Sequence, residues 1–340
     1  MSAPEDRAPP RQGGLFGPPE DPRTSAPKVA PAPVEEATEQ VAAKLHPKLR
    51  LGTSSWAFEG WRGLVYAAGA AKRHLSKHGL PAYSQHPLLR TVGVDRTFYA
   101  PIPKSAFFDY AEQVPDSFRF LVKAWEEITT PQLRGRAGLN PNYLDANCAA
   151  DRCVAPATDG LGAKLGPLLL QFPPQGEDTT ARPEAFADRL HGFLTCLPRG
   201  LRYVVEVRDA ALFTPRYVAS LRDAGAHHGY VVHPRMPSLA KQRALAPLDG
   251  PVTVRWMLRR GLSYQQAKDR YEPFGALVDR DAEARGDIAA MAYDAAGRDE
   301  EMTVVVNNKA EGSSPLSVME LARQIAQASV DVNARSTPAS

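Results

Sequence analysis

Several features that mark other protein classes are scarce or missing in this chain of 340 residues. Its only cysteines are Cys148, Cys153 and Cys196, an odd and sparse count that argues against a disulfide framework and for a reducing compartment. No apolar run approaches the roughly 18 residues that a membrane span needs. No charged-then-apolar signal peptide opens the sequence. We therefore expect a cytoplasmic protein with no membrane partner.

Motifs that identify common cofactor sites are also missing. The sequence has no nucleophile elbow, no P-loop and no dinucleotide fingerprint. Cys148 and Cys153 have no second pair or nearby histidines, so we interpret them as small buried thiols of a helical region. Asp95, Glu206 and His233 could supply metal ligands, but without HxH or ExxH spacing. The sequence predicts no cofactor and leaves a metal open.

Neither sign of charge is in excess. There are 41 basic and 38 acidic residues, which gives a net charge of +3, and 43% of the residues are hydrophobic. This composition can build a core, and it does not indicate an obligate nucleic-acid binder, which would show a concentrated basic face. Nucleic acid stays an alternative partner.

Proline is abundant, with 31 residues that cluster towards the N-terminus. Residues 1–33 have too little apolar content to offset the entropy of ordering, so they predict a disordered Pro-rich tail. Residues 34–48 predict a lead-in helix or linker, because 34–45 show helical spacing. We expect one domain over 49–328 and a disordered end over 329–340.

Eight short β-branched or apolar runs alternate with longer stretches in this domain. The runs are 50–56, 91–98, 118–125, 166–172, 202–208, 228–234, 252–258 and 302–309. Helices are predicted over 104–114, 183–197, 215–225 and 315–328, the last two opened by Thr214-Pro215 and Ser314-Pro315. Eight strands that alternate with helices over roughly 260 residues predict an α/β fold, the (β/α)8 TIM-type barrel. An open doubly wound sheet is the alternative, but the first run lacks the Gly-rich loop that often follows there. The long connection over 126–164 is expected to form an elaborated loop over the active face.

Polar residues fall mainly at the C-terminal ends of the runs, where a barrel builds its active site. The catalytic candidates are Glu206, Lys123 and Asp95. The substrate-binding candidates are Arg208, Arg255, Asn308, Asn307, Gln171, His233, Trp56 and Tyr99. Two arginines and a lysine can converge on a phosphate or carboxylate. Glu206 would then be the general acid or base and Asp95 a second carboxylate.

Structural roles are possible for the same residues. Glu206 and Arg208 are two apart in one run, about 7 Å by the strand rise, so we do not expect them to pair with each other. Glu206 can instead join Lys123 or Arg255 in a buried structural network. Asp95 can pair with its neighbour Arg96.

The remaining candidates have structural alternatives too. Lys123 can cap a carbonyl at the rim, and Gln171 can bridge backbone groups. His233, which precedes a proline, can mark a loop. Trp56 and Tyr99 can be core or rim aromatics.

A series of motifs over roughly residues 49–328 resembles the YecE-like family, catalogued as domain of unknown function 72. They are "LGTSSWAFEGWRGLVY", "TFYAPIP", "FRFLVKAWEEIT", "GPLLLQFPP", "VVEVRDAALF" and "VVVNNKAEGSSPLSVMELA", in this order. The resemblance implies a TIM-type barrel. The matching positions are Gly52, Ser54, Trp56, Trp61, Phe98, Tyr99, Lys123, Gln171, Pro173, Glu206, Arg208, Arg255 and Asn308. This chain departs from the pattern at Ser55, where Gly is common, at Asp95, where Glu is usual, and in "RWML" (255–258), where many members read Arg-x-His-Gly. The resemblance implies no established reaction.

We expect an enzyme, a hydrolase, lyase or isomerase, that uses acid/base chemistry on a small anionic or sugar-like metabolite. The alternative is a non-catalytic nucleotide or nucleic-acid binding module, with Trp56, Trp61 and Tyr99 as stacking surfaces. A third possibility is a scaffold whose tail recruits partners.

Overall fold

Eight parallel strands close into a barrel in this computed structural model, which describes residues 28–336. The strands are β1 (Leu49–Thr53), β2 (Thr91–Val94), β3 (Arg119–Lys123), β4 (Leu165–Phe172), β5 (Tyr203–Val207), β6 (His227–Val232), β7 (Val252–Trp256) and β8 (Met302–Val306). They lie in sequence order, and β8 pairs back with β1 from Leu49 opposite Met302 to Thr53 opposite Val306. The predicted (β/α)8 barrel is confirmed.

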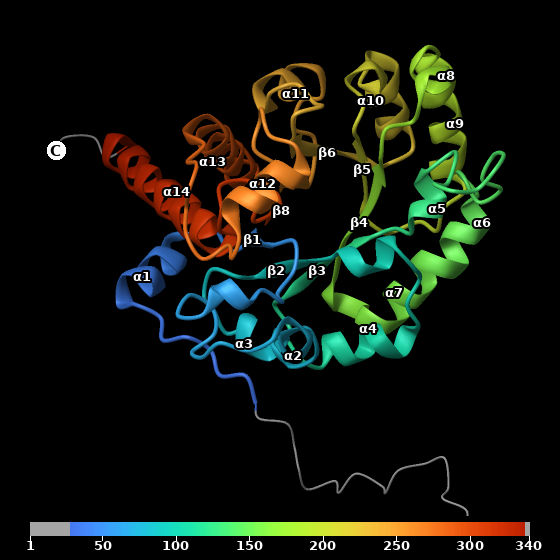
Figure 1. The fold of residues 1–340 in the computed structure, drawn as a ribbon. Helices are drawn as coiled ribbons and strands as arrows, with labels where there is room; N and C mark the ends of the chain where they lie inside the picture. The colour runs from blue at the N-terminus through green and yellow to red at the C-terminus, as the bar shows by residue number, and fades with distance from the viewer. Residues whose placement is uncertain (1–27, 337–340) are drawn as a thin grey trace, which may run out of the picture.

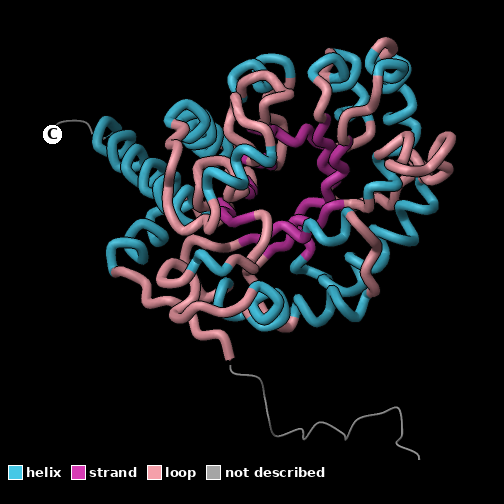
Figure 2. The backbone as a smooth tube through the Cα atoms, viewed as in Figure 1, coloured by secondary structure: helices cyan, strands magenta, loops and turns pink. Residues whose placement is uncertain are grey.

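Helices form a ring outside the strands (Figures 1 and 2). They are α1 (Glu36–Lys44), α2 (Lys72–His78), α3 (Leu80–Tyr83), α4 (Lys104–Ala111), α5 (Glu126–Thr129), α6 (Ala146–Ala149), α7 (Ala155–Leu161), α8 (Glu177–Thr180), α9 (Pro183–Thr195), α10 (Pro215–Asp223), α11 (Leu239–Leu245), α12 (Tyr264–Tyr271), α13 (Ala282–Gly297) and α14 (Ser314–Ser336). Short turns of 3-10 helix include η2 (Asp95–Phe98) directly after β2. Helix α4 packs on α7, α9 on α10, and α14 on both α1 and α13.

All eight predicted strands are present, although several end earlier than predicted. The run predicted over 91–98 divides at Val94, where η2 begins. Helix α10 starts as predicted, because the Thr214 hydroxyl accepts a hydrogen bond from the Tyr217 amide at 3.2 Å. The last helix begins at Ser314 itself and continues to Ser336, into the stretch that was predicted to be disordered.

The N-terminal prediction concerns mostly residues outside the described range, so the disorder of 1–27 stays a prediction. Residues 28–33 were assigned to the same tail, but they contact the barrel domain. The Ala32 amide donates to the Val65 carbonyl at 2.9 Å, and the Ala67 amide donates to the Ala30 carbonyl at 3.0 Å. The stretch 126–164 holds α5, α6 and α7 rather than only a loop. Between residues 28 and 336, no helix has the length and apolar character to cross a membrane.

An apolar layer fills the inside of the barrel. Leu121, Leu169, Val204 and Val305 form a fully buried cluster, separate from the larger core between strands and helices. Gly229 leaves room for this layer, because a Cβ atom there would lie 2.9 Å from a Val204 methyl group. Side chains alternate between the two faces of a strand, so the residues two positions later along each strand also face inwards. These positions form a second layer, at the C-terminal ends of the strands.

Candidate functional site

The second inward-facing layer is polar. Lys123, Gln171 and Glu206 lie two residues after Leu121, Leu169 and Val204. Gln171 lies opposite Glu206 in the pairing of β4 with β5. Other strands add Asp95 directly after β2, Arg255 in β7 and Asn307 directly after β8. The sequence therefore brings its main candidates to one end of the barrel, as predicted.

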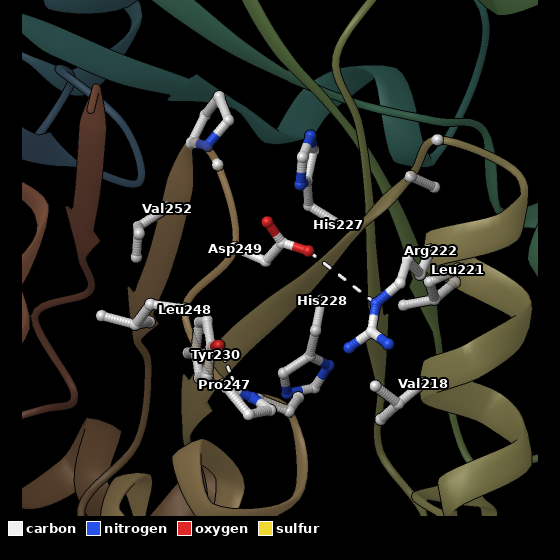
Figure 3. A pocket seen from close by; sticks show the side chains of 15 residues that line it. Val218, Leu221, Arg222, His227, His228, Tyr230, Pro247, Leu248, Asp249 and Val252 are labelled. Atoms are coloured by element: carbon white, nitrogen blue, oxygen red, sulfur yellow. Dashed lines mark hydrogen bonds and ion pairs between the residues drawn. The ribbon is translucent and has the colours of Figure 1, made fainter. Parts of the chain in front are cut away.

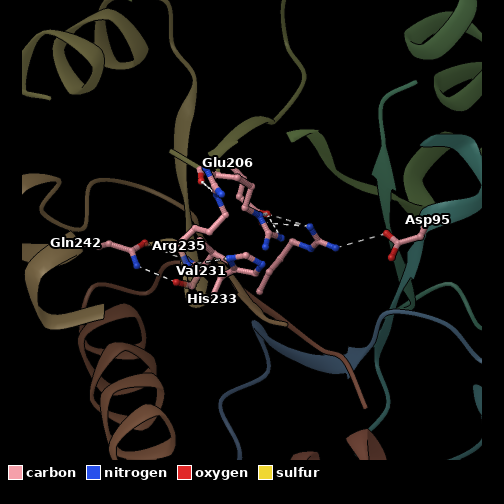
Figure 4. A network of polar contacts seen from close by, with 8 residues as sticks. Asp95, Glu206, Val231, His233, Arg235 and Gln242 are labelled. Carbon is pink, nitrogen blue, oxygen red and sulfur yellow. Dashed lines mark hydrogen bonds and ion pairs between the residues drawn. The ribbon is translucent and has the colours of Figure 1, made fainter. Parts of the chain in front are cut away.

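Glu206 is the centre of this layer and is 0% exposed. Its Oε1 accepts a hydrogen bond from Arg208 Nε at 2.6 Å, and Arg255 Nη1 lies 3.2 Å from each of its carboxylate oxygens. The Nη2 atom of Arg255 lies 3.6 Å from Asp95 Oδ1, so one guanidinium links carboxylates from opposite sides of the barrel (Figure 4).

The prediction that Glu206 and Arg208 would not pair was wrong. It assumed that both residues keep the geometry of one extended strand. Strand β5 ends at Val207, and the side chain of Arg208 reaches back to Glu206. The predicted alternative, a buried network of Glu206 with Arg255, is present as well.

The two arginines determine the charge of Glu206. Burial alone would raise its pKa, but the positive charges of Arg208 and Arg255 hold the pKa below its ordinary value. Both carboxylate oxygens already accept hydrogen bonds from guanidinium groups. A carboxylate in this environment stays ionised and is a weak proton acceptor.

Lys123 is the titratable group of the layer. Its side chain is 8% exposed, and its Nζ atom lies 3.4 Å from the ring centroid of Phe98. Burial is the main cause that lowers its pKa to about 7, and the charge of Arg255 lowers it further, against the opposite effect of Asp95. Among the described side chains, no carboxylate lies within ion-pair distance of this amine. The positive charges of Arg208 and Arg255 already balance the carboxylates of Glu206 and Asp95.

Two polar atoms in the layer are buried without a hydrogen-bond partner in the described structure. They are Arg255 Nε, a donor, and Asp95 Oδ1, an acceptor. Buried polar groups are nearly always satisfied, so these two atoms are exceptions in the layer, although Asp95 Oδ1 still has its ion pair with Arg255. The Asp95 side chain is 33% exposed and is the most accessible of the charged groups at the site.

His233 lies at the border of the layer. Its Nδ1 accepts a hydrogen bond from the Arg235 amide at 3.2 Å. Burial and the charge of Arg208 lower its pKa to about 3, so the ring is neutral near pH 7. Arg235 in turn donates to the Arg208 carbonyl at 3.0 Å and to Asp209 Oδ1 at 2.7 Å. Arg235 and Asp209, which the sequence reasoning missed, thus tie the loops after β5 and β6 together.

The side chains of Asn307 and Asn308 make contacts in different parts of the structure. Asn307 donates from Nδ2 to Ser54 Oγ at 2.9 Å and stays in the polar layer. Asn308 Oδ1 accepts from the amide and the hydroxyl of Ser314, at 2.8 and 2.7 Å. Asn308 therefore anchors the first turn of α14 and is not brought to the charged cluster.

The two aromatic candidates, Trp56 and Tyr99, also lie in different surroundings. Trp56 is buried against Tyr110, with ring centroids 5.3 Å apart, and donates from Nε1 to the Ser76 carbonyl at 3.2 Å. Trp56 is thus a core residue. Tyr99 is 74% exposed and lies outside the buried charged cluster.

Tyr264 lies near Tyr99 at the exposed rim of the barrel, and the sequence reasoning did not identify it. It is 64% exposed, and Lys309 Nζ lies 4.1 Å from its ring centroid. Tyr264 follows Ser263, which forms the capping box of α12 with Gln266. That capping signal predicts the start of a helix, but it does not show which part of the barrel the helix reaches.

A separate cavity of about 160 Å³ lies away from the charged layer, at the N-terminal ends of β6 and β7 (Figure 3). Its polar groups already have partners in the protein. Arg222 and Asp249 form an ion pair at 3.8 Å, and His228 contacts Tyr217 and Gln242 at 3.2 Å each. The described residues contain no group of three or more His, Cys, Asp or Glu side chains that could hold a metal ion.

Comparisons with known proteins agree with the barrel. A DUF72 family protein from Enterococcus faecalis V583 is 16% identical, with a TM-score of 0.56 over 81% of this chain and 95% of that one. A DUF72 family protein from Thermotoga maritima MSB8 is 17% identical, with a TM-score of 0.54 over 82% of this chain and 98% of that one. No curated protein matches the chain. The family model described as "Protein of unknown function DUF72" matches residues 50–340, so the chain belongs to the DUF72 family.

Proposed function

We propose that this protein is an enzyme that uses acid/base chemistry on a small anionic or sugar-like metabolite at the C-terminal end of the barrel. The observation that supports the proposal most is Lys123, a buried amine whose pKa is lowered to about 7 and which has no carboxylate within ion-pair distance in the described part of the chain. A base poised near the working pH transfers protons efficiently. Burying a lysine without a partner destabilises a fold, and such groups concentrate at functional sites.

The proposed roles follow from charge and accessibility. Arg208 and Arg255 bind the anionic group of the substrate, and Glu206 fixes their positions. Lys123 takes or gives the proton, a role that the sequence alone assigned first to Glu206. Asp95 is accessible enough to act as a second proton carrier. Hydrolase, lyase and isomerase reactions can all use this arrangement.

Binding of a simple anion tests the proposal. Calorimetric titration of the full chain with inorganic phosphate and with oxalate is expected to detect binding, and Lys123→Met is expected to weaken it at least tenfold. Lys48→Met is the matched control, because Lys48 precedes β1 at the other end of the barrel and bonds Asp299. Absence of binding to the unmodified protein, or equal binding by Lys123→Met, would overturn the proposal.

A nucleic-acid partner is the second candidate, and one surface favours it. A groove of about 610 Å³ beside α2 and α4 is lined by Lys72, Arg73, Lys77 and Arg96, with Asp109 as its acidic member. Of the three stacking residues expected from sequence, Trp56 and Trp61 are buried and Tyr99 is 74% exposed. Binding of a labelled single-stranded oligonucleotide should weaken steeply with salt and fall further in Lys77→Glu. Salt-insensitive binding, or none, would remove this candidate.

A further inference from the structure

We propose that Lys123 is a covalent catalytic residue, which forms an imine with the carbonyl carbon of a small 2-oxo acid. The inference rests on the proposed function, since it concerns the same site, and it names the substrate class and the chemical step.

The geometry of the amine is the first argument. Lys123 is the last residue of β3 and faces the inside of the barrel, on the same face as Leu121. Another lysine of low exposure shows what such amines normally do here. Lys164 Nζ donates to the carbonyls of Ala111 and Val114, each at 2.8 Å. Lys123 Nζ has an aromatic ring at 3.4 Å instead, and no hydrogen-bond acceptor among the described residues.

A nucleophilic amine must be neutral, and burial makes the neutral form of Lys123 available near pH 7, although the Phe98 ring favours the charged form. Burial is the largest cause of the lowered pKa of Lys123, which lies near 7. The nearby carboxylates do not return the pKa of Lys123 to its ordinary value, because Glu206 is held by two arginines and Asp95 lies beside Arg255. Desolvation next to other cations is a recognised way of activating a lysine for attack on a carbonyl.

The neighbouring arginines select the substrate class. Arg255 is 1% exposed and is held in place by Glu206, and its Nε donor is unpaired. Its charge is close enough to Lys123 to lower the pKa of the amine. A short substrate is needed to place an anionic group on the arginines and a carbonyl on the lysine. A 2-oxo acid has its carboxylate directly bonded to its carbonyl carbon.

The chemical step balances without a metal or an oxidant. The lone pair of Nζ attacks the carbonyl carbon, a C–N bond forms, and the carbonyl oxygen takes the proton that the nitrogen loses. The resulting hydroxyl takes a second proton from solvent, the C–O bond breaks, and the oxygen leaves as water, so that a protonated imine remains. Amine and carbonyl thus become imine and water. The protonated imine accepts electrons from an adjacent bond, and Asp95 can accept a proton released there.

Reductive trapping tests the inference. The full chain is incubated near pH 7 with cyanoborohydride and either pyruvate or dihydroxyacetone phosphate, and the labelled peptide is identified by mass spectrometry. We expect one reduced pyruvate adduct per chain, on Lys123. Lys123→Arg should lose it and Lys48→Met should keep it. An adduct with dihydroxyacetone phosphate alone would support imine formation and overturn the 2-oxo acid class.

Failure of this inference can be told apart from failure of the proposed function. No adduct, or equal labelling of surface lysines, overturns the imine. If oxalate binding still requires Lys123, the acid/base function stands without the covalent step. If oxalate binding is also missing, both proposals fail.

Discussion

Replacing Glu206 with glutamine is expected to destabilise the protein strongly. The substitution keeps the shape of the side chain but removes its charge. Arg208 and Arg255 then stay buried with only Asp95 nearby, at 3.6 Å from Arg255. Breaking a buried ion pair by removing one partner costs about 3–5 kcal/mol. In proteins of 150–250 residues each kcal/mol lowers Tm by roughly 2–4 °C, so we expect a fall on the order of 10 °C.

Glu206→Gln should also change the pH dependence of the free energy of unfolding. The arginines hold the pKa of Glu206 below its ordinary value. A carboxylate of this kind stabilises the fold above its unfolded-state pKa, and the contribution is lost as the pH falls through the folded-state value. Urea unfolding of the unmodified protein should therefore show stability falling below about pH 4.5. Glu206→Gln should show a smaller fall over the same range.

An exposed ion pair supplies the control. Asp188 pairs with Arg216 at 2.6 Å, but both side chains are about half exposed. Asp188→Asn should leave Tm almost unchanged, because surface ion pairs contribute little. A Tm for Glu206→Gln that matches Asp188→Asn would refute the assignment of Glu206 as the anchor of two arginines.

The other predictions concern Lys123 and two structural contacts. Lys123→Met should stabilise the fold by about 1–3 kcal/mol at pH 6, because burial destabilises the charged amine below its folded-state pKa. This gain in stability should shrink as the pH rises from about 7 towards 10.5. Thermal unfolding at several pH values that shows no gain would contradict the prediction. Asn308→Ala should cost about 1–3 kcal/mol in urea unfolding by leaving the start of α14 at Ser314 without its acceptor, whereas a loss limited to anion binding would show that Asn308 belongs to the site. Thr214→Ala should cost about 1 kcal/mol by removing the cap of α10, and an unchanged urea midpoint would refute that role.

The barrel and its polar layer could be predicted from sequence because both depend on alternation along single strands. A run such as 202–208 shows its apolar and charged positions directly, and the strand end places Glu206 in the layer. The same rule gives Lys123 and Gln171. No contact between distant parts of the chain is needed for these predictions.

The side chains whose placement differs from the expected one lie where strands end and alternation stops. Arg208 lies beyond β5, and its side chain reaches back to Glu206. Asn308 lies beyond β8, in a turn that carries it to Ser314. Trp56 likewise follows β1 and packs on Tyr110. Tyr264 reaches the rim through the fold of the connection between β7 and β8, which no local pattern encodes.

The central claim is that an anion binds beside a neutral Lys123, and proton uptake on binding tests it most directly. Oxalate stays a dianion near pH 8, so any proton taken up comes to the protein. The incoming charge should raise the pKa of Lys123 above about 7. Titration calorimetry in buffers of different ionisation enthalpy should therefore show uptake of a substantial fraction of one proton, lost in Lys123→Met. Oxalate binding without proton uptake, or with the same uptake in Lys123→Met, would contradict the account.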